Sequence, residues 1–303
     1  MAKHLLKLMD LSEKEITDIL NLADQLKYEK KHGIEHHILK GKTLGMIFQK
    51  SSTRTRVSFE VGMYDLGGSA LFLSSRDLQI GRGEPVEDTA RVLSGYLDGI
   101  MIRTFEQAEV EALAEYGSIP VINGLTDYCH PCQVLADLMT FREFKGNFKD
   151  KKMCFIGDGN NMANSLIVGG IKMGMAVSVA CPKTNQPDAE IMKWASENGD
   201  FTCTEDILIA AKDADVIYTD VWASMGQEDE KAEREKIFAG YQINDEVMTV
   251  ANKGAMVQHC LPAHREEEIT AKVFEEHAEE IFAEAENRLH AQKAVLVKLM
   301  SDN

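Results

Sequence analysis

Short apolar runs and amphipathic segments alternate along the chain, and this alternation sets the predicted architecture. Residues 43–48 form a mostly apolar run typical of a buried strand, and residues 57–64 then carry apolar side chains at helical spacing. Ser12 and Glu15 have the spacing of a helix capping box. Because strand and helix patterns keep alternating, we predict an α/β fold with parallel sheets flanked by helices.

The first half of the chain carries four strand patterns, at residues 43–48, 69–74, 99–103 and 119–123. Helical spacing occupies residues 86–96 and 107–116, and another helix is expected from residue 130 to about residue 144. The segment 78–85 is rich in glycine and polar residues, so it is predicted to be a loop.

A polar stretch at residues 145–150 is where a second domain is expected to begin. Strand patterns follow at residues 153–157, 175–180, 216–219 and 257–262, with a short one near residue 201. Helices are predicted after the first of these strands and at residues 190–198, 205–212 and 289–300. This order predicts a Rossmann-type topology, and Arg288 is expected at the start of the last helix.

Hydroxyl and guanidinium groups crowd the join between the first strand and its helix. Ser52, Thr53, Arg54 and Thr55 fall in the first helical turn, where unpaired backbone N–H groups meet the positive end of the helix dipole. Such a turn binds phosphate well. The simpler interpretation is an ordinary serine cap followed by a solvated arginine.

Two further polar residues fall at the same edge of the predicted sheet. Arg103 ends the third strand, and the loop after the fourth strand leads to His130. Ligands of parallel sheets bind at the carboxyl ends of the strands, so this coincidence favours a phosphate site. A solvated strand end is the alternative for Arg103 alone.

Composition narrows the class of ligand. The chain has 303 residues, a formal net charge of −16, and 44% hydrophobic and 27% charged residues. The length suits two domains, whereas the negative charge disfavours nucleic acid, which needs a basic face. A small anion stays compatible if basic side chains gather locally. Without an apolar run of ~20 residues or an evident signal peptide, we expect a cytoplasmic protein with no membrane partner.

Two motifs suggest other chemistry and are disfavoured. Cys129-His-Pro-Cys132 matches a redox C-x-x-C pattern, but the second ligand pair of a zinc site is missing. Gly157 and Gly159 match the first two positions of a dinucleotide fingerprint, but Met162 stands at the third. We therefore expect neither a metal ion nor a cofactor.

Four motifs together resemble the aspartate/ornithine carbamoyltransferase family, and they span most of the chain. They are Ser52-Thr-Arg-Thr55 with Phe59-Glu60, His130-Pro-Cys-Gln133, His259-Cys-Leu-Pro262, and Asp220 with Ser224-Met-Gly226. Each motif is short, whereas their order and spacing together are highly specific. The last motif is similar to that of the family's ornithine-using members.

The resemblance implies transfer of the carbamoyl group of carbamoyl phosphate to the δ-amine of L-ornithine, giving L-citrulline and phosphate. It implies a carbamoyl-phosphate-binding domain at residues 1–145 and an ornithine-binding domain at residues 146–285, joined by an interdomain helix. A C-terminal helix at residues 286–303 would return to the first domain. It also implies a homotrimer with sites at subunit interfaces, and Cys132 resembles the biosynthetic members, which favours arginine biosynthesis.

The family's residue roles transfer to matching positions. Phosphate binding is implied for Ser52, Thr53, Arg54 and Thr55, with Gln79 from the adjacent subunit. Carbamoyl binding is implied for Arg103, His130, Pro131, Cys132, Gln133, Cys260, Leu261 and Arg288. Ornithine binding is implied for Asn161, Asp220, Ser224 and Met225. The candidate catalytic residues are Arg103, His130, Asp220 and Cys260.

The residue types suit this reaction. Attack of an amine on a carbonyl carbon forms an oxyanion and releases phosphate, so cations and hydrogen-bond donors must surround one centre. The amine must also lose a proton, and Asp220 and Cys260 are candidates to help, without a single general base being chosen. A helix cap and a buried core thiol are the simpler interpretations of these two residues.

Several alternatives stay open. An aspartate-using relative should carry more cations for a second carboxylate, and a putrescine-using one should lack the Ser224-Met225-Gly226 pattern and carry a C-terminal extension. Acetylated-ornithine relatives are a minor alternative. Outside the family, the broken glycine pattern opposes a nicotinamide oxidoreductase. The gathering of basic groups opposes a non-catalytic phosphate-binding or regulatory protein.

Overall fold

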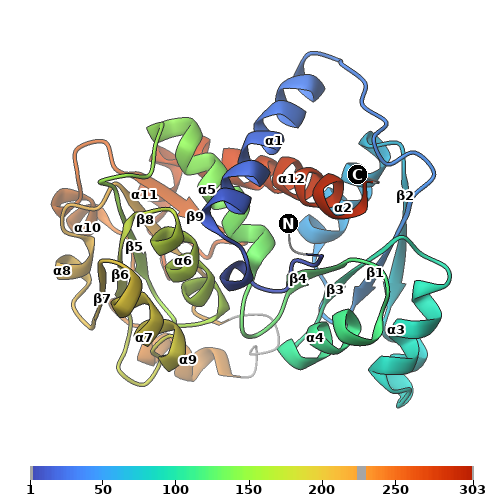
Figure 1. Cartoon of the computed structure of the whole chain (residues 1–303). Helices are drawn as coiled ribbons and strands as arrows, with labels where there is room; N and C mark the ends of the chain where they lie inside the picture. Colours follow the sequence, from blue (N-terminus) through green and yellow to red (C-terminus); the bar gives the residue numbers. More distant parts are fainter. Residues whose placement is uncertain (1–2, 224–229, 302–303) are drawn as a thin grey trace. The chain divides into compact units, whose positions relative to one another are not determined.

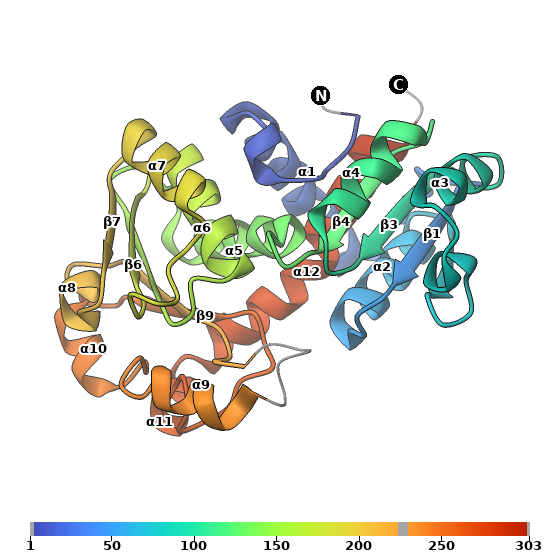
Figure 2. The same ribbon diagram turned by 90° about the horizontal axis from the view of Figure 1, so that it is seen from below.

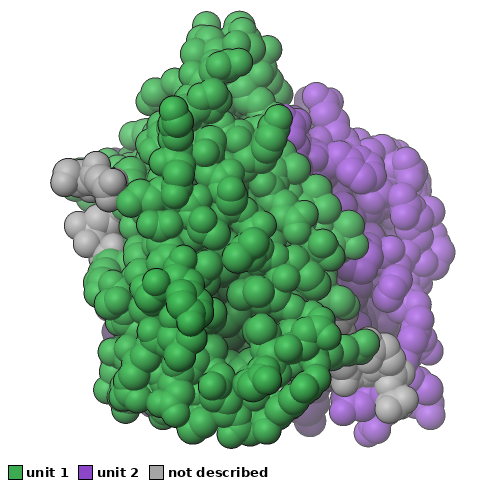
Figure 3. Space-filling view, turned by 90° about the vertical axis from the view of Figure 1, so that its right-hand side faces the viewer, with its two compact units in different colours: residues 1–139, 287–303 green, residues 140–286 purple. Residues whose placement is uncertain are grey.

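A computed structural model describes residues 3–223 and 230–301 of the chain. It divides into two compact units, coloured separately in Figure 3: Met1–Met139 with Asn287–Asn303, and Thr140–Glu286. The chain leaves unit 1 within helix α5 (Pro131–Lys145) and returns to it within helix α12 (Ala278–Met300).

Unit 1 is built on a four-stranded parallel sheet in the order β2-β1-β3-β4. Its strands are β1 (Thr43–Phe48), β2 (Ser69–Ser74), β3 (Gly99–Arg103) and β4 (Val121–Leu125). The register pairs Phe48 of β1 with Arg103 of β3, and Arg103 with Leu125 of β4. The carboxyl ends of three strands therefore meet at one edge of the sheet.

Helices cover both faces of this sheet (Figures 1 and 2). Helix α2 (Thr53–Asp65) and helix α12 lie on one face, and α3 (Val86–Ser94) and α4 (Gln107–Tyr116) lie on the other. The N-terminal helix α1 (Glu13–Lys31) follows a short 3-10 turn, Leu8–Asp10.

The predicted capping box of α1 is confirmed. Ser12 Oγ accepts a hydrogen bond from Glu15 N at 3.2 Å, and Glu15 Oε2 accepts one from Ser12 N at 2.9 Å. The two residues thereby satisfy backbone groups that a helix start leaves unpaired.

Unit 2 contains a five-stranded parallel sheet in the order β7-β6-β5-β8-β9, which is the strand order of a Rossmann fold. Its strands are β5 (Lys152–Ile156), β6 (Ala176–Ala180), β7 (Phe201–Thr204), β8 (Val216–Thr219) and β9 (Met256–His259). The predicted α/β class and the Rossmann-type second sheet are thus confirmed.

In Figure 2, helices cover both faces of this second sheet. They are α6 (Asn161–Lys172) and α7 (Ala189–Asn198) on one face, and α8 (Ile207–Ala211) and α10 (Asp245–Val250) on the other. Two more short helices complete the described part of unit 2. Helix α9 (Lys231–Ile237) comes before α10 in the chain, and α11 (Ala271–Glu276) comes after β9. Among the described helices, none combines the length and apolarity that crossing a bilayer requires.

The sequence prediction is wrong at the C-terminal helix. Helix α12 begins at Ala278, so Arg288 lies inside the helix instead of at its start. The many glutamates before Arg288 mask the helical pattern, although Ile281 among them is fully buried. At β9 the strand ends at His259, so Cys260 lies in the segment that follows it.

Three short helical segments also escape the sequence pattern. Helices α10 and α11 have only six residues each, too few for an amphipathic period to be recognised. The expected loop at residues 78–85 contains a 3-10 turn, Gln79–Arg82.

Candidate active site

Helix α2 begins where the sequence predicts a phosphate-binding turn. Ser52 is its N-cap, and the hydroxyl accepts a hydrogen bond from Thr55 N at 3.2 Å and donates one to Thr55 Oγ1 at 3.1 Å. Thr53 and Arg54 occupy the first turn. This turn presents backbone N–H groups and the positive end of the helix dipole, which suits an anion.

Arg288 reaches the same turn from α12. Its Nη2 donates to Thr55 Oγ1 at 3.1 Å, and its Nη1 donates to Gln133 Oε1 at 2.6 Å. Gln133, in the first turn of α5, donates from Nε2 to Asp137 Oδ1 at 2.8 Å. Arg288 is only 3% exposed. Three helices therefore hold one buried guanidinium beside the capped turn.

His130 follows β4 and is buried near two arginines. Burial lowers its pKa well below the ordinary value, and the positive charges of Arg288 and Arg103 lower that pKa further. The imidazole is therefore neutral at neutral pH and offers one donor and one acceptor. Arg103, at the end of β3, is also buried. Unit 1 thus gathers the predicted residues Thr55, Arg103, His130, Gln133 and Arg288.

The C-x-x-C cysteines lie in the core of unit 1. Burial raises the pKa of both the Cys129 and the Cys132 thiol to about 12. Cys132 donates from Sγ to Asn123 O at 3.3 Å. Thiols protonated at neutral pH are poor nucleophiles and poor metal ligands, so this geometry disfavours the redox interpretation. Pro131 begins α5, a position that suits proline.

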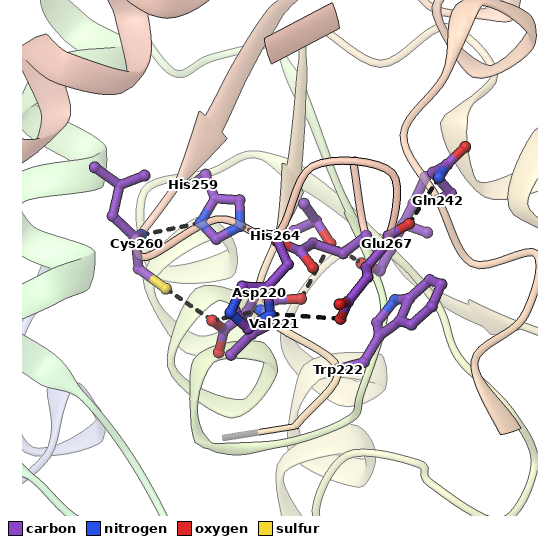
Figure 4. Close-up of polar contacts among 12 residues, drawn as sticks. Asp220, Val221, Trp222, Gln242, His259, Cys260, His264 and Glu267 are labelled. Carbon is purple, nitrogen blue, oxygen red and sulfur yellow. Dashed lines mark hydrogen bonds and ion pairs between the residues drawn. The ribbon is translucent and has the colours of Figure 1, made fainter. Parts of the chain in front are cut away.

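The second group of predicted residues lies in unit 2, at the ends of β8 and β9 (Figure 4). Cys260 donates from Sγ to Asp220 Oδ1 at 3.0 Å, and Val221 N donates to the same oxygen at 2.8 Å. Asn160 donates from Nδ2 to Asp220 Oδ2 at 3.1 Å. Asp220 therefore holds the thiol and the amide in place, which goes beyond the helix-cap interpretation.

The sequence prediction names Asn161 but misses its neighbour Asn160. Asn160 is the N-cap of α6, where Oδ1 accepts hydrogen bonds from Met162 N at 2.9 Å and Ala163 N at 3.3 Å, and its amide also orients Asp220. An asparagine just before an apolar helical run is a capping signal that could have identified it. Asn161 is the first residue of α6.

The structure of the single chain does not test the predicted roles of three site residues. Ser224 and Met225 lie outside the described residues. Gln79 begins the 3-10 turn at residues 79–82 and is exposed. Its contact with an adjacent subunit stays a prediction.

The glycine-rich turn after β5 is filled by the protein's own backbone. A Cβ at Gly159 would lie 2.3 Å from both Gln186 C and Pro187 N, and Gly159 N donates to Asn185 O at 2.9 Å. A dinucleotide fingerprint keeps this glycine bare so that a pyrophosphate can approach. Here the backbone of residues 185–187 occupies the space beside Gly159 that a pyrophosphate would need, which argues against a nicotinamide cofactor.

One group among the described residues has the spacing of metal ligands. Ligand atoms of His264, Glu267 and Glu268 lie within 4.8 Å of one another. Glu267 already pairs with Lys231 at 2.9 Å, and Glu268 with His259 at 3.0 Å. Since both carboxylates already have protein partners, we assign no ion to this group.

Comparison with known proteins identifies the family of the chain. Two domain profiles of the aspartate/ornithine carbamoyltransferase family match the chain, the carbamoyl-P binding domain at residues 3–143 and the Asp/Orn binding domain at residues 149–299. The ornithine carbamoyltransferase of Syntrophotalea carbinolica is 56% identical over 302 residues, which cover 99% of this chain and 100% of the relative.

Solved structures give the same result. The ornithine carbamoyltransferase from Pyrococcus furiosus has a TM-score of 0.95 and 52% identity, covering 99% of this chain and 97% of that one. The anabolic ornithine carbamoyltransferase from Campylobacter jejuni has a TM-score of 0.92 and 44% identity, covering 98% and 99%. The chain therefore belongs to the aspartate/ornithine carbamoyltransferase family.

Proposed function

We propose that this protein transfers the carbamoyl group of carbamoyl phosphate to the δ-amine of L-ornithine, giving L-citrulline and phosphate. The observation that carries the proposal is the buried cluster of unit 1, in which Arg103 and Arg288 are buried near His130. Burial lowers the pKa of His130, and the charges of Arg288 and Arg103 lower that pKa further. Guanidinium groups bind phosphate oxygens through charge-assisted hydrogen bonds, and the first turn of α2 adds backbone N–H donors. Sequence identity of 55–56% to ornithine carbamoyltransferases, over 99% of the chain, supports the same substrates.

In the proposed reaction the amine nitrogen attacks the carbonyl carbon, and the electron pair of the double bond moves to the carbonyl oxygen. Arg103 and His130 donate hydrogen bonds to this oxyanion. Arg288, Thr55 and the first turn of α2 hold the phosphate, which leaves when the carbon–oxygen bond breaks. Each such donor typically accounts for about 10²–10³ in rate. Binding both substrates in line supplies further acceleration without a covalent intermediate.

On the acceptor side, the Asp220 carboxylate is the group that we assign to the substrate amine. It is 7% exposed, and Cys260 and Asn160 fix both of its oxygens. A carboxylate held in this way stabilises an ammonium group and can take its proton as attack proceeds. Asn161, Ser224 and Met225 complete the proposed ornithine site.

The direction and the assembly form part of the same proposal. Relatives named anabolic include those of Pyrococcus furiosus and Campylobacter jejuni, and we infer citrulline synthesis for arginine biosynthesis. Unit 1 would bind carbamoyl phosphate, completed by Cys260 and Leu261, and unit 2 would bind L-ornithine. We also propose a homotrimer in which Gln79 serves an adjacent subunit's site, and light scattering of the purified protein would test its mass.

Citrulline formation tests the proposal directly. Purified protein supplied with carbamoyl phosphate and L-ornithine should form citrulline and phosphate in equal amounts. L-Aspartate and putrescine, offered at the same concentration, are the matched alternative acceptors. Absence of citrulline, or product with only one of the alternative acceptors, would overturn the assignment.

A further inference from the structure

Glu268 is a fully buried carboxylate that lies outside the four sequence motifs but contacts one of them in space. Its side chain and that of His259 are both 0% exposed. Glu268 Oε1 lies 3.0 Å from His259 Nε2 and accepts a hydrogen bond from His264 N at 2.6 Å. One carboxylate oxygen thus receives a ring donor and a backbone donor.

The two ring nitrogens of His259 have different partners, and these fix the tautomer. Leu261 N donates to His259 Nδ1 at 2.9 Å. A backbone N–H bonds only to a ring nitrogen that carries no hydrogen, so the hydrogen lies on Nε2. Nε2 faces the Glu268 carboxylate and donates a hydrogen bond to it. Glu268 therefore selects the ring form that can hold Leu261.

The residues held in this way include a candidate catalytic group. Leu261 has a φ of 55°, a left-handed conformation that residues other than glycine rarely adopt, and the bond to His259 Nδ1 helps to hold it. Cys260 lies between His259 and Leu261 in the chain, and its thiol donates to Asp220 at 3.0 Å. The His259 ring is thus bonded to the residue that directly follows Cys260 in the chain.

The backbone at His259 has an anchor that does not involve Glu268. His259 N donates to Glu284 Oε2 at 2.9 Å, and Tyr218 OH donates to Glu284 Oε1 at 3.1 Å. Loss of the Glu268 carboxylate therefore releases the imidazole ring while β9 stays attached.

From this geometry we propose that Glu268 is a positioning residue for carbamoyl transfer. It acts through the His259 ring to hold Cys260 and Leu261 beside Asp220, without touching the substrate itself. The inference rests on the proposed function of Asp220 and Cys260. Wild-type citrulline synthesis is therefore measured first, since an inactive wild type defeats the function, whereas an active wild type leaves Glu268 to be tested.

Two nearly isosteric variants isolate the acceptor. Glu268→Gln keeps a carbonyl oxygen for His259 Nε2, and Glu268→Met removes it. We expect Glu268→Met to lower kcat/KM for L-ornithine by about 10²-fold, the typical cost of misplacing a site by about 1 Å, and Glu268→Gln to restore most of that loss. Inhibition by inorganic phosphate, which reports on the first turn of α2, should be unchanged in both. Equal activity of the two variants would overturn the inference.

A change of thiol exposure separates local positioning from general loosening. Alkylation by iodoacetamide, followed by peptide mass spectrometry, should be faster at Cys260 in Glu268→Met and unchanged at the core residue Cys154, which is fully buried in wild type. Parallel acceleration at both cysteines would contradict a positioning role.

A second pair of variants acts at the ring itself and covers the case in which Glu268→Met does not fold. His259→Asn can still offer an oxygen to Leu261 N, whereas His259→Leu cannot. We expect His259→Asn to be the more active of the two, and equal activities would overturn the inference. Where Glu268→Met folds, adding it to His259→Asn should cost far less than it costs alone, because no ring is left to orient; a fully additive loss would show that Glu268 acts independently of His259.

Discussion

Arg288 and Thr55 lie 233 positions apart in the sequence, yet the guanidinium donates a hydrogen bond to the Thr55 hydroxyl at 3.1 Å. The same hydroxyl receives the hydrogen bond of Ser52, the capping residue of α2. One threonine oxygen thus joins the N-terminal turn of α2 to a cation on α12. The proposed phosphate-binding turn therefore takes its side chains from both helices.

Replacement of Arg288 by lysine should separate charge from geometry. A lysine keeps the positive charge but cannot donate to Thr55 and Gln133 in the forked arrangement of the guanidinium. We expect kcat/KM for carbamoyl phosphate to fall by about 10²-fold or more. The matched control is Arg91→Lys on α3, where the side chain is 58% exposed and activity should not change. Wild-type kinetics in Arg288→Lys would remove this residue from the site.

Arg54 and Arg56 provide a second matched pair within one helix turn. Arg54 is placed in the proposed phosphate turn, whereas Arg56 pairs with Glu60 on an exposed surface at 3.0 Å. Arg54→Ala should abolish citrulline formation with an unchanged circular dichroism spectrum and oligomeric mass. Arg56→Ala should retain activity. If the two alanine variants were equally active, the phosphate site would have to lie elsewhere.

The stability of the protein should fall in mild acid because of His130. Its folded-state pKa lies well below the ordinary value, owing first to burial and then to Arg288 and Arg103. As pH falls below about 6.5, the unfolded chain binds a proton at this residue that the folded state does not, so the free energy of unfolding decreases. The slope contributed by one such group approaches about 1.4 kcal/mol per pH unit.

Thermal unfolding at a series of pH values measures this slope. His130→Gln should unfold with a shallower dependence on pH between about pH 7 and about pH 5, since glutamine does not titrate. An unchanged slope would show that His130 is not a buried neutral group.

The ion pair of Lys293 and Asp65 in unit 1 predicts different changes in stability when the cation or the carboxylate is removed. Lys293 is fully buried, and its Nζ lies 3.3 Å from Asp65 Oδ2 and 2.7 Å from His36 Nε2; burial is the first cause that lowers its pKa. Lys293→Met should leave stability unchanged or raise it, because Asp65 keeps Lys30 at 2.6 Å. Asp65→Ala should destabilise by about 1–3 kcal/mol, since it leaves a buried ammonium group with one carboxylate fewer. Urea unfolding of both variants gives the comparison.

Much of the fold follows from patterns that are local in sequence. The strand at residues 43–48 and the capped turn after it need only a short apolar run and a serine before a helical period. The placement of Arg103 at a strand end follows in the same way. For this reason the amino-acid sequence alone is enough to place Ser52 to Thr55 at the start of α2, whereas their binding of phosphate stays a prediction.

Other parts of the site depend on contacts between distant segments, which no local pattern reports. Asp137 orients Gln133, and Glu268 orients His259, but both look like ordinary acidic residues in the sequence. Only burial distinguishes them: each is 0% exposed. The interior position of Arg288 is hidden for a related reason, because the exposed Glu279 and Glu286 precede it in α12 and interrupt the apolar pattern.

The division of α12 between the two units has a consequence for synthesis of the chain. Unit 2 is one continuous segment, Thr140–Glu286, whereas unit 1 needs Asn287–Asn303 in addition to Met1–Met139. During translation the Rossmann-type unit can therefore finish folding first, although the ribosome begins with the other. A nascent chain that stops before Arg288 would carry both sheets and yet lack the guanidinium that donates to Thr55 in the first turn of α2.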